Sequence, residues 1–485
     1  MPRLSFSEIK AEVKSKSQQA KGKLPVKKII PHKDVLSEML DKVESLDYQK
    51  EAKTDKKLSK KHFLVITVEK IIELAKKQDW GLCKRHDFIY LYNGAFWDQI
   101  EEDSLQSFLG SVAYNMGVDR IESKYHRFRD ELLKQFMVTA HLPAPEKDNS
   151  EVLINLKNGT VEINPEAENK VNLRPPDSND FITYQLPFEY DPYATSPLFD
   201  KYLDHVLPSK DLQKLLAEYL GYIFLKPSTL KLEKALLLYG SGSNGKSVFF
   251  DTVNAMLGEE NVSTYTLKSL TNQNGYYRAK IANKLLNYAS EIDGEMSTAL
   301  FKQLVSGEPV EARLPYGEPF TLNNYAKLIF NCNELPTDVE HTNAFFRRFL
   351  IVPFDVTIPP EKQDKKLSYK IIENELSGVF NWVIEGLHRV LKQKGFTECE
   401  EVNQQVEKYR TESDSVLSFL DERGYKSSTI SYTPLAELYQ SYRRFCEQDG
   451  YKPCGNRKFS SRLKNAGYIT ERKEYGRVFY VVQNL

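Results

Sequence analysis

The stretch ALLLYGSGSNGKSVFF, residues 235–250, decides the fold of the central part of the chain. Its first five residues, Ala235 to Tyr239, form an apolar run of the length expected for a buried strand. Eight residues rich in glycine and serine, 240–247, end that run. Apolar side chains return with helical spacing over residues 248–257, so the stretch predicts a strand, a loop and a helix in succession.

The loop fits the phosphate-binding pattern G-x-x-x-x-G-K-[ST] in full. In such a loop the backbone N–H groups cradle the β-phosphate, and the helix that follows adds partial positive charge. Lys246 would reach the β- and γ-phosphates, and the Ser247 hydroxyl would help to hold Mg²⁺. A purely structural glycine-rich turn is the alternative, but the flanking strand and helix favour a nucleotide site, for which we expect ATP. Its predicted residues are Gly240, Ser241, Gly242, Ser243, Asn244, Gly245, Lys246 and Ser247.

A carboxylate that organises Mg²⁺ and water is expected at the end of a neighbouring buried strand. Residues 284–289 predict such a strand, and Glu291 follows it where the carboxyl edge of a parallel sheet would lie. We therefore assign Glu291 to the metal and to activation of the attacking water. Asp293 either shares this role or is a solvated loop acid.

Residues 326–330 predict another buried strand, and Asn333 follows it. A neutral amide at this place can hydrogen-bond the γ-phosphate or the attacking water, which makes Asn333 a candidate sensor. The alternative is an asparagine that caps the turn before Pro336.

Two arginines, Arg347 and Arg348, lie between aromatic and aliphatic residues in the segment FFRRF. An arginine supplied to the γ-phosphate of a neighbouring subunit would stabilise charge in the transition state and couple hydrolysis to assembly. An ordinary salt-bridged arginine at the start of a strand is the other interpretation.

Together these elements resemble the superfamily 3 helicases, in particular the phage and plasmid primase-helicase branch that includes the poxvirus primase-helicase. GSGSNGKS resembles its Walker A motif, YASEID its Walker B motif, FNCNELP its motif C and FFRRF its arginine-finger motif. The likeness covers roughly residues 63–412. In motif C the family's asparagine falls on Asn333, with Asn331 as the alternative, and either Arg347 or Arg348 is the finger.

The resemblance implies an α/β fold with a P-loop AAA+ (superfamily 3) ATPase core and a homo-hexameric ring with ATP between subunits. It also implies 3′ to 5′ translocation on single-stranded DNA by a loop in the central pore. Residues 313–317 are the candidate loop, because a basic side chain would meet phosphate and an aromatic ring would stack on a base; an exposed turn without a ligand is the alternative. The predicted contacts are Arg313, Tyr316 and Lys302, which lies in the segment 301–313 that resembles the family's B′ segment.

The family often carries a primase domain upstream of the helicase. A Lys-rich segment stands there in this chain, so we expect no priming activity, and a separate primase or other replication proteins are further expected partners.

The C-terminal residues predict helices over 435–448 and 457–465 and a hairpin around 474–476, which is a winged-helix order. Between residues 441 and 477 there are ten basic and four acidic side chains. This excess predicts DNA binding, with a protein-docking winged helix as the alternative. The candidate contacts are Arg457, Lys458, Arg462, Lys464, Arg472, Lys473 and Arg477.

Composition bounds these interpretations. The chain of 485 residues has 67 basic and 67 acidic side chains, so total charge gives no argument for nucleic-acid or membrane binding. Its five cysteines lack C-x-x-C pairs, which argues against a disulfide framework and a structural zinc site. Without a signal-peptide pattern or a long apolar run, we expect a soluble cytoplasmic protein of a bacterial or other host of a mobile element, and no membrane partner.

The sequence predicts five segments in order. They are a Lys-rich and flexible tail over 1–62, an α+β accessory domain over 63–200, an ATPase core over 201–360, a helical segment and linker over 361–420, and a winged helix over 421–485. Hairpins are expected over 88–97 and 152–163.

The leading hypothesis is an ATP-dependent DNA helicase that acts on single-stranded and forked DNA in the replication of a phage, plasmid or other mobile element. It would also melt an origin if the C-terminal segment recognises one. An origin- or operator-binding protein with ATP as an assembly switch, and a translocase that moves duplex DNA without separating its strands, are the alternatives.

Overall fold

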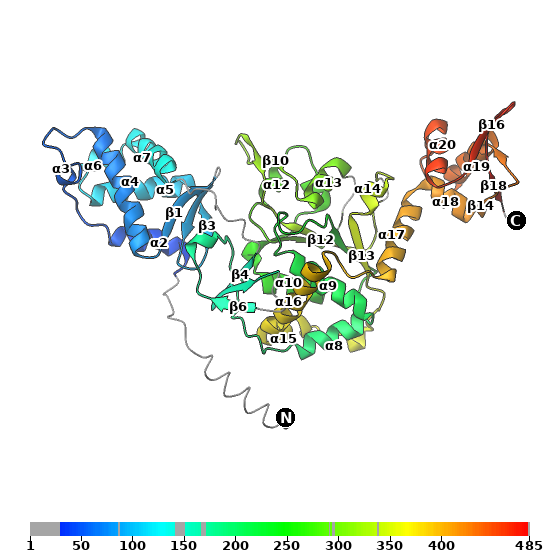
Figure 1. The fold of residues 1–485 in the computed structure, drawn as a ribbon, viewed down its shortest axis with the longest axis horizontal. Helices are drawn as coiled ribbons and strands as arrows, with labels where there is room; N and C mark the ends of the chain where they lie inside the picture. Colours follow the sequence, from blue (N-terminus) through cyan, green and yellow to red (C-terminus); the bar gives the residue numbers. More distant parts are fainter. Residues whose placement is uncertain are drawn as a thin grey trace, which may run out of the picture. The chain divides into compact units, whose positions relative to one another are not determined.

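The computed structural model describes residues 30–85, 88–140, 151–165, 171–290, 292, 296–336 and 339–483. They belong to two compact units, residues 1–190 and residues 191–485 (Figure 1). Among the described residues, no helix combines the length and the apolar character needed to cross a membrane.

The first unit combines helices with two antiparallel three-stranded sheets. Its helices are α2 (His32–Asp41), α3 (Tyr48–Glu51), α4 (Lys60–Lys77), α5 (Glu102–Asn115), α6 (Arg120–Lys124) and α7 (His126–Thr139). One sheet contains β1 (Gly81–Arg85), β2 (Phe88–Tyr92) and β3 (Trp97–Ile100), and the other contains β4 (Val152–Leu156), β5 (Gly159–Ile163) and β6 (Val171–Arg174). The predicted hairpins are confirmed, because β2 pairs with β3 and β4 pairs with β5.

Residues 30–62 correct the prediction of a flexible tail. They contain α2 and α3, and Val35, Met39 and Tyr48 are buried in the core beside α4 and α5. The high lysine content misled the prediction because the lysines occupy the solvent side of short amphipathic helices, whose few apolar residues are enough to dock them.

The second unit is built on a five-stranded parallel sheet, in the order β13-β7-β12-β9-β8. This confirms a mixed α/β fold with a parallel sheet and the strands predicted over 235–239, 284–289 and 326–330. The strands are β7 (Ala235–Tyr239), β8 (Val262–Ser263), β9 (Leu286–Ala289), β12 (Lys327–Cys332) and β13 (Phe349–Pro353). The side chains of β7 are almost entirely buried, because both faces of the sheet are covered.

Helices from distant parts of the chain cover the sheet. Figure 1 shows α13 and α14 on one side of it and α9, α10 and α16 on the other. The helices of this core are α8 (Pro197–Val206), α9 (Lys210–Tyr222), α10 (Lys246–Leu257), α11 (Leu267–Leu270), α12 (Tyr276–Ala279), α13 (Thr298–Ser306), α14 (Asn343–Phe346), α15 (Leu367–Asn374), α16 (Leu376–Gln393) and α17 (Glu400–Ser413). A two-stranded hairpin, β10 (Val310–Arg313) and β11 (Pro319–Leu322), follows α13.

Helices α9 and α16 pack with their backbones in close approach. A Cβ added at Gly386 would lie 2.2 Å from the Ala217 carbonyl carbon, and one added at Gly221 would lie 2.6 Å from the Leu387 nitrogen. Since α15 and α16 also contact α10, residues 367–393, which the sequence predicts to be helical, pack against the core.

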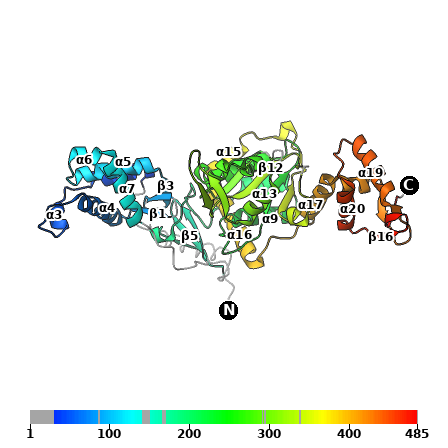
Figure 2. The same ribbon diagram turned by 90° about the horizontal axis from the view of Figure 1, so that it is seen from above.

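Beyond α17 the chain forms a small module with its own core, in which Phe419, Tyr442 and Phe459 are buried. Figure 2 shows α17 leading to it. Its elements are α18 (Ser415–Glu422), β14 (Tyr425–Ser427), β15 (Thr433–Pro434), α19 (Leu435–Gln448), α20 (Asn456–Asn465), β16 (Thr470–Lys473), β17 (Gly476–Phe479) and β18 (Val481–Gln483). The two predicted helices and the hairpin are therefore confirmed.

Candidate nucleotide site

The loop between β7 and α10 lies at the carboxyl edge of the parallel sheet and is tied to its neighbours there. The N–H of Gly240 donates to the Cys332 carbonyl at the end of β12, at 3.1 Å. The Asn244 side chain, which is 3% exposed, donates to the Phe354 carbonyl at 2.9 Å, and the Ile358 N–H donates to the Ser243 carbonyl at 2.8 Å. The loop is thus anchored both to β12 and to the segment after β13.

Two of the loop glycines are required by geometry. Gly245, which precedes α10, has a φ of 89°, and a Cβ there would lie 2.8 Å from Val206 Cγ1 on α8. A Cβ on Gly240 would lie 2.4 Å from the Phe354 oxygen. Gly242 faces open space, with nothing within 4 Å of such a Cβ. The pattern of the motif therefore reflects close packing at its first and last glycines.

Lys246 and Asn333 are brought together, as the sequence predicts. The Lys246 ammonium donates to the carbonyls of Gly240 and Ser241 and lies 3.4 Å from Asn333 Oδ1. Burial lowers the pKa of Lys246, since the side chain is only 7% exposed and little water reaches it. An incoming anion would therefore meet a poorly hydrated ammonium group.

The two candidate sensor residues occupy different environments. Asn331 is buried within β12, and its Oδ1 accepts a hydrogen bond from the Tyr288 hydroxyl at 3.0 Å. Asn333 is exposed one residue beyond the strand, on the side of Lys246. This placement favours Asn333 over Asn331 as the group that faces a ligand.

The groups around the loop suit a phosphate chain and a divalent cation. As at the start of any helix, the first backbone amides of α10, those of Lys246 and Ser247, have no acceptor within the helix. The loop residues Ser241, Gly242 and Ser243 are exposed. The exposed Ser247 hydroxyl is a hard oxygen ligand of the kind that Mg²⁺ prefers. The two predicted carboxylates, Glu291 and Asp293, lie outside the described residues.

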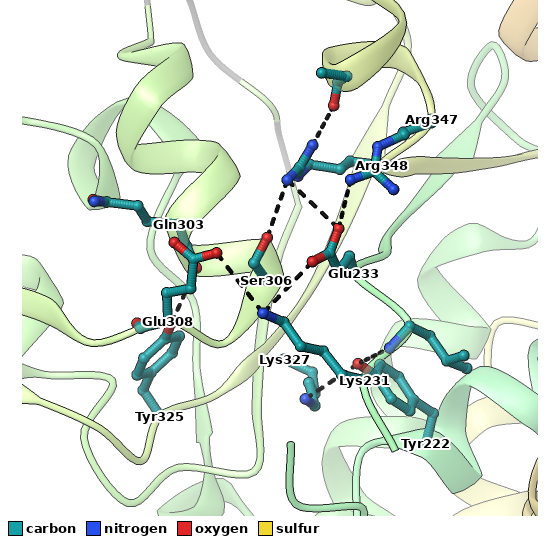
Figure 3. A network of polar contacts seen from close by, with 12 residues as sticks. Tyr222, Lys231, Glu233, Gln303, Ser306, Glu308, Tyr325, Lys327, Arg347 and Arg348 are labelled. Carbon is teal, nitrogen blue, oxygen red and sulfur yellow. Dashed lines mark hydrogen bonds and ion pairs between the residues drawn. The ribbon is translucent and has the colours of Figure 1, made fainter. Parts of the chain in front are cut away.

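The arginine pair lies at the opposite, amino-terminal edge of the sheet. The Arg348 carbonyl accepts a hydrogen bond from the Ala235 N–H, where β7 begins, at 2.8 Å. Its side chain is 10% exposed, contacts Ser306 Oγ at 3.2 Å and lies 3.5 Å from Glu233 Oε2 (Figure 3). The Arg347 side chain is 53% exposed and donates to the same Glu233 oxygen at 2.8 Å. The Arg348 guanidinium is therefore largely buried, whereas the Arg347 guanidinium lies at the surface.

The predicted loop over 313–317 is the turn of the hairpin between β10 and β11. Tyr316 is fully exposed and has a φ of 61°, while the Arg313 Nε donates to the Gly317 carbonyl at 2.7 Å. Lys302 does not belong to the turn: it lies on α13 and pairs with Glu340 at 2.8 Å. The hairpin thus presents an aromatic ring and a cation at one turn.

In the C-terminal module most of the predicted basic contacts are exposed: Arg457, Lys458, Lys464, Arg472 and Arg477. Lys473 is partly covered, with its ammonium 3.9 Å from the centre of the Tyr432 ring. The prediction for Arg462 is wrong. Its side chain is 14% exposed and donates to the buried Asp414 carboxylate at 2.9 Å, because Asp414 caps α18 beneath α20.

Three residues that support the sites carry no sequence signal. Tyr202 on α8 donates to the Gly245 carbonyl at 2.8 Å, Phe354 accepts from Asn244 through its backbone, and Glu233 holds both arginines. A tyrosine in an amphipathic helix and a glutamate before a strand are common in every fold, so only the tertiary contacts identify them.

Comparison with known proteins gives matches in three parts of the chain. Residues 238–348 match a family of unknown function, DUF5906, residues 69–208 match the "D5 N terminal like" family, and residues 411–482 match the "Poxvirus D5 protein-like" family. A protein of Acanthamoeba polyphaga mimivirus named "Putative helicase" is 23% identical over an alignment of 282 residues that covers 53% of this chain. The chain spans 29% of the length of that relative.

Solved structures of the NrS-1 C-terminal region cover 85% of this chain and 98% of their own. One of them, an A-form apo structure, is 13% identical with a TM-score of 0.46, and another apo structure is 15% identical with a TM-score of 0.43.

Proposed function

This chain is related to the phage and viral primase-helicases, and we propose that it is an ATP-dependent DNA helicase that acts in the replication of a mobile element. In this proposal the β7–α10 loop is the P-loop of an AAA+ core of superfamily 3, and the C-terminal module is a winged helix. The expected cofactors are ATP and Mg²⁺, and the expected assembly is a homo-hexameric ring.

One observation supports the proposal: the residues of the phosphate-binding loop and the exposed arginine lie at opposite edges of one sheet. Lys246 and Asn333 lie at the carboxyl edge, and the exposed Arg347 lies at the amino-terminal edge. The five residues of β7 separate these edges by about 16 Å, at about 3.3 Å per residue. Arg347 therefore does not serve its own loop, and it becomes useful for hydrolysis when it faces the loop of another subunit.

In the assembled site each residue has a distinct role. The loop amides and Lys246 hold the β- and γ-phosphates, and Ser247 provides an oxygen ligand for the metal. Asn333 orients the attacking water or the γ-phosphate without adding charge. Arg347 of the neighbouring subunit stabilises the charge that develops on the transferred phosphoryl group. Ser247 and the predicted carboxylate Glu291 would hold Mg²⁺, which when bound would neutralise part of the phosphate charge, and Glu291 would also activate the water.

The DNA is proposed to pass the β10–β11 hairpin. Tyr316 is fully exposed, and an aromatic ring beside Arg313 suits a single strand of DNA, whose bases stack and whose phosphates are anionic. The exposed cations on α20 and on the hairpin of the C-terminal module suit the backbone of a duplex or a fork. Translocation from 3′ to 5′ is the direction that the kinship suggests.

Strand displacement on forked DNA tests the proposal. The wild-type chain should release the labelled strand from a fork with a 3′ tail in the presence of ATP and Mg²⁺, and a 5′ tail alone should not suffice. Single-stranded DNA should stimulate hydrolysis, and Lys246→Ala should abolish both activities. Hydrolysis without displacement or stimulation would point instead to an ATP-switched DNA-binding protein or a duplex translocase.

A further inference from the structure

Glu233 lies two residues before β7 and has an unusual backbone conformation. Its backbone has a φ of 54°, in the left-handed region that residues with a side chain seldom adopt. This conformation aims its carboxylate at Arg347, whose guanidinium donates to it at 2.8 Å, and at Arg348, at 3.5 Å. Lys231 lies 3.5 Å from the other carboxylate oxygen (Figure 3).

The carboxylate is outnumbered by cations. Figure 3 shows Glu233 in a network in which the only other labelled acid is Glu308, which lies 3.7 Å from Lys231. Partial burial by itself would raise the pKa of Glu233, but the charges of Arg348, Arg347 and Lys231 lower it. Glu233 is therefore ionised at neutral pH.

The two arginines depend on Glu233 to different degrees. Arg348 is largely buried and keeps Ser306 and the Ala344 carbonyl as further partners. For the Arg347 guanidinium, Glu233 is the one hydrogen-bond or ion-pair partner found among the described residues. A substitution of Glu233 should therefore release the Arg347 side chain, whereas Arg348 keeps its other hydrogen bonds.

We propose that Glu233 is a positioning residue that holds Arg347 in the free subunit and competes for it with the γ-phosphate bound by a neighbour. This inference rests on the proposed function. Competition follows from charge: a carboxylate in contact with the guanidinium would lie close to the phosphate that the same guanidinium binds, and two anions so placed repel each other. Release of Arg347 then accompanies assembly around nucleotide, and an unassembled subunit keeps its arginine engaged.

The size of the effect follows from exposure. The pair joins side chains that are 53% and 22% exposed, so the ion pair is of the weak, water-screened kind. Loss of the competing charge should therefore favour engagement of the neighbour by about twofold to fivefold. In Glu233→Gln the amide oxygen still accepts a hydrogen bond from Arg347, so only the charge is lost.

The test measures ATP hydrolysis by the full chain as a function of protein concentration. Glu233→Gln should lower the protein concentration at half-maximal rate by about twofold to fivefold and leave the rate at saturating protein within about twofold of wild type. Ser306→Ala is the matched control, because it removes a contact of Arg348 and leaves the pair of Glu233 and Arg347 intact. It should shift neither quantity.

An unchanged or increased half-maximal concentration in a folded Glu233→Gln protein would overturn the inference, and so would a loss of the saturating rate. If that variant does not fold, as judged by thermal unfolding, Glu233→Asp keeps the charge but draws the oxygen that both arginines share away from each of them. It should lower the half-maximal concentration in the same direction. A different result would show that the proposed function itself is wrong: Arg347→Ala would then retain full ATP turnover. Loss of turnover in Arg347→Ala without a shift in Glu233→Gln would refute the competition alone.

Discussion

The two arginines should separate catalysis from stability when each is replaced by alanine. Arg347→Ala removes one exposed ion pair, so it should lower the free energy of unfolding by only about 0.2–1 kcal/mol. Arg348→Ala removes a largely buried cation from Glu233 and Ser306, and the loss should approach about 3 kcal/mol. Urea denaturation of the two variants measures this difference.

Turnover should show the opposite order. Because β7 keeps Arg347 about 16 Å from the loop of its own subunit, Arg347→Ala should bind ATP normally but hydrolyse it on the order of 10³-fold more slowly. A folded Arg348→Ala protein should keep more of its activity, since its guanidinium is not at the surface. Binding of a fluorescent ATP analogue and release of phosphate measure the two steps separately.

Mixing variants tests whether the site is shared. Lys246→Ala keeps Arg347, and Arg347→Ala keeps the loop, so each supplies the half that the other lacks. In an equal, random mixture about a quarter of the sites join an intact loop to an intact arginine, and hydrolysis should recover to about that fraction of wild type. Two variants that assemble together and still show no activity at any ratio would refute the shared site.

Single substitutions test three other features of the structure. Gly245→Ala should weaken ATP binding at least about tenfold, because its Cβ would lie 2.8 Å from Val206 and the backbone φ is 89°. Gly242→Ala should bind ATP as wild type does, and calorimetric titration measures both affinities. Burial lowers the pKa of Lys327 to about 8, below its ordinary value of about 10.5, so between these pH values the unfolded chain holds more protons and wild-type stability should rise with pH. Lys327→Met should remove that rise and add at most about 3 kcal/mol to the free energy of unfolding at pH 7, measured by urea denaturation. If the free energy of unfolding rises equally with pH in both proteins, the lowered pKa of Lys327 is contradicted. Tyr316→Ala should leave thermal unfolding unchanged, because the ring is fully exposed, and should weaken binding to single-stranded DNA by about 1–3 kcal/mol in fluorescence anisotropy.

Much of the fold was predictable where one pattern dominates a segment. The apolar run Ala235 to Tyr239 forms β7, and the predicted hairpins and C-terminal helices form where their turn residues and periodicity place them. The prediction failed at residues 30–62, where lysine content outweighed a few apolar positions. It also failed at Arg462. Helical spacing does not reveal that the buried carboxylate of Asp414, at the start of α18, binds the Arg462 guanidinium.

The sequence by itself determined the loop, because a phosphate-binding turn is local: the strand, the glycines and the lysine are contiguous, and their backbone geometry follows from residue type. Only the tertiary structure decided which asparagine and which arginine are available. Asn331 is held by Tyr288 and Arg348 is buried beside Glu233, whereas Asn333 lies beside Lys246 and Arg347 is at the surface. These choices depend on contacts between residues up to 115 positions apart in the chain. A local sequence pattern does not show which distant residues pack against a side chain.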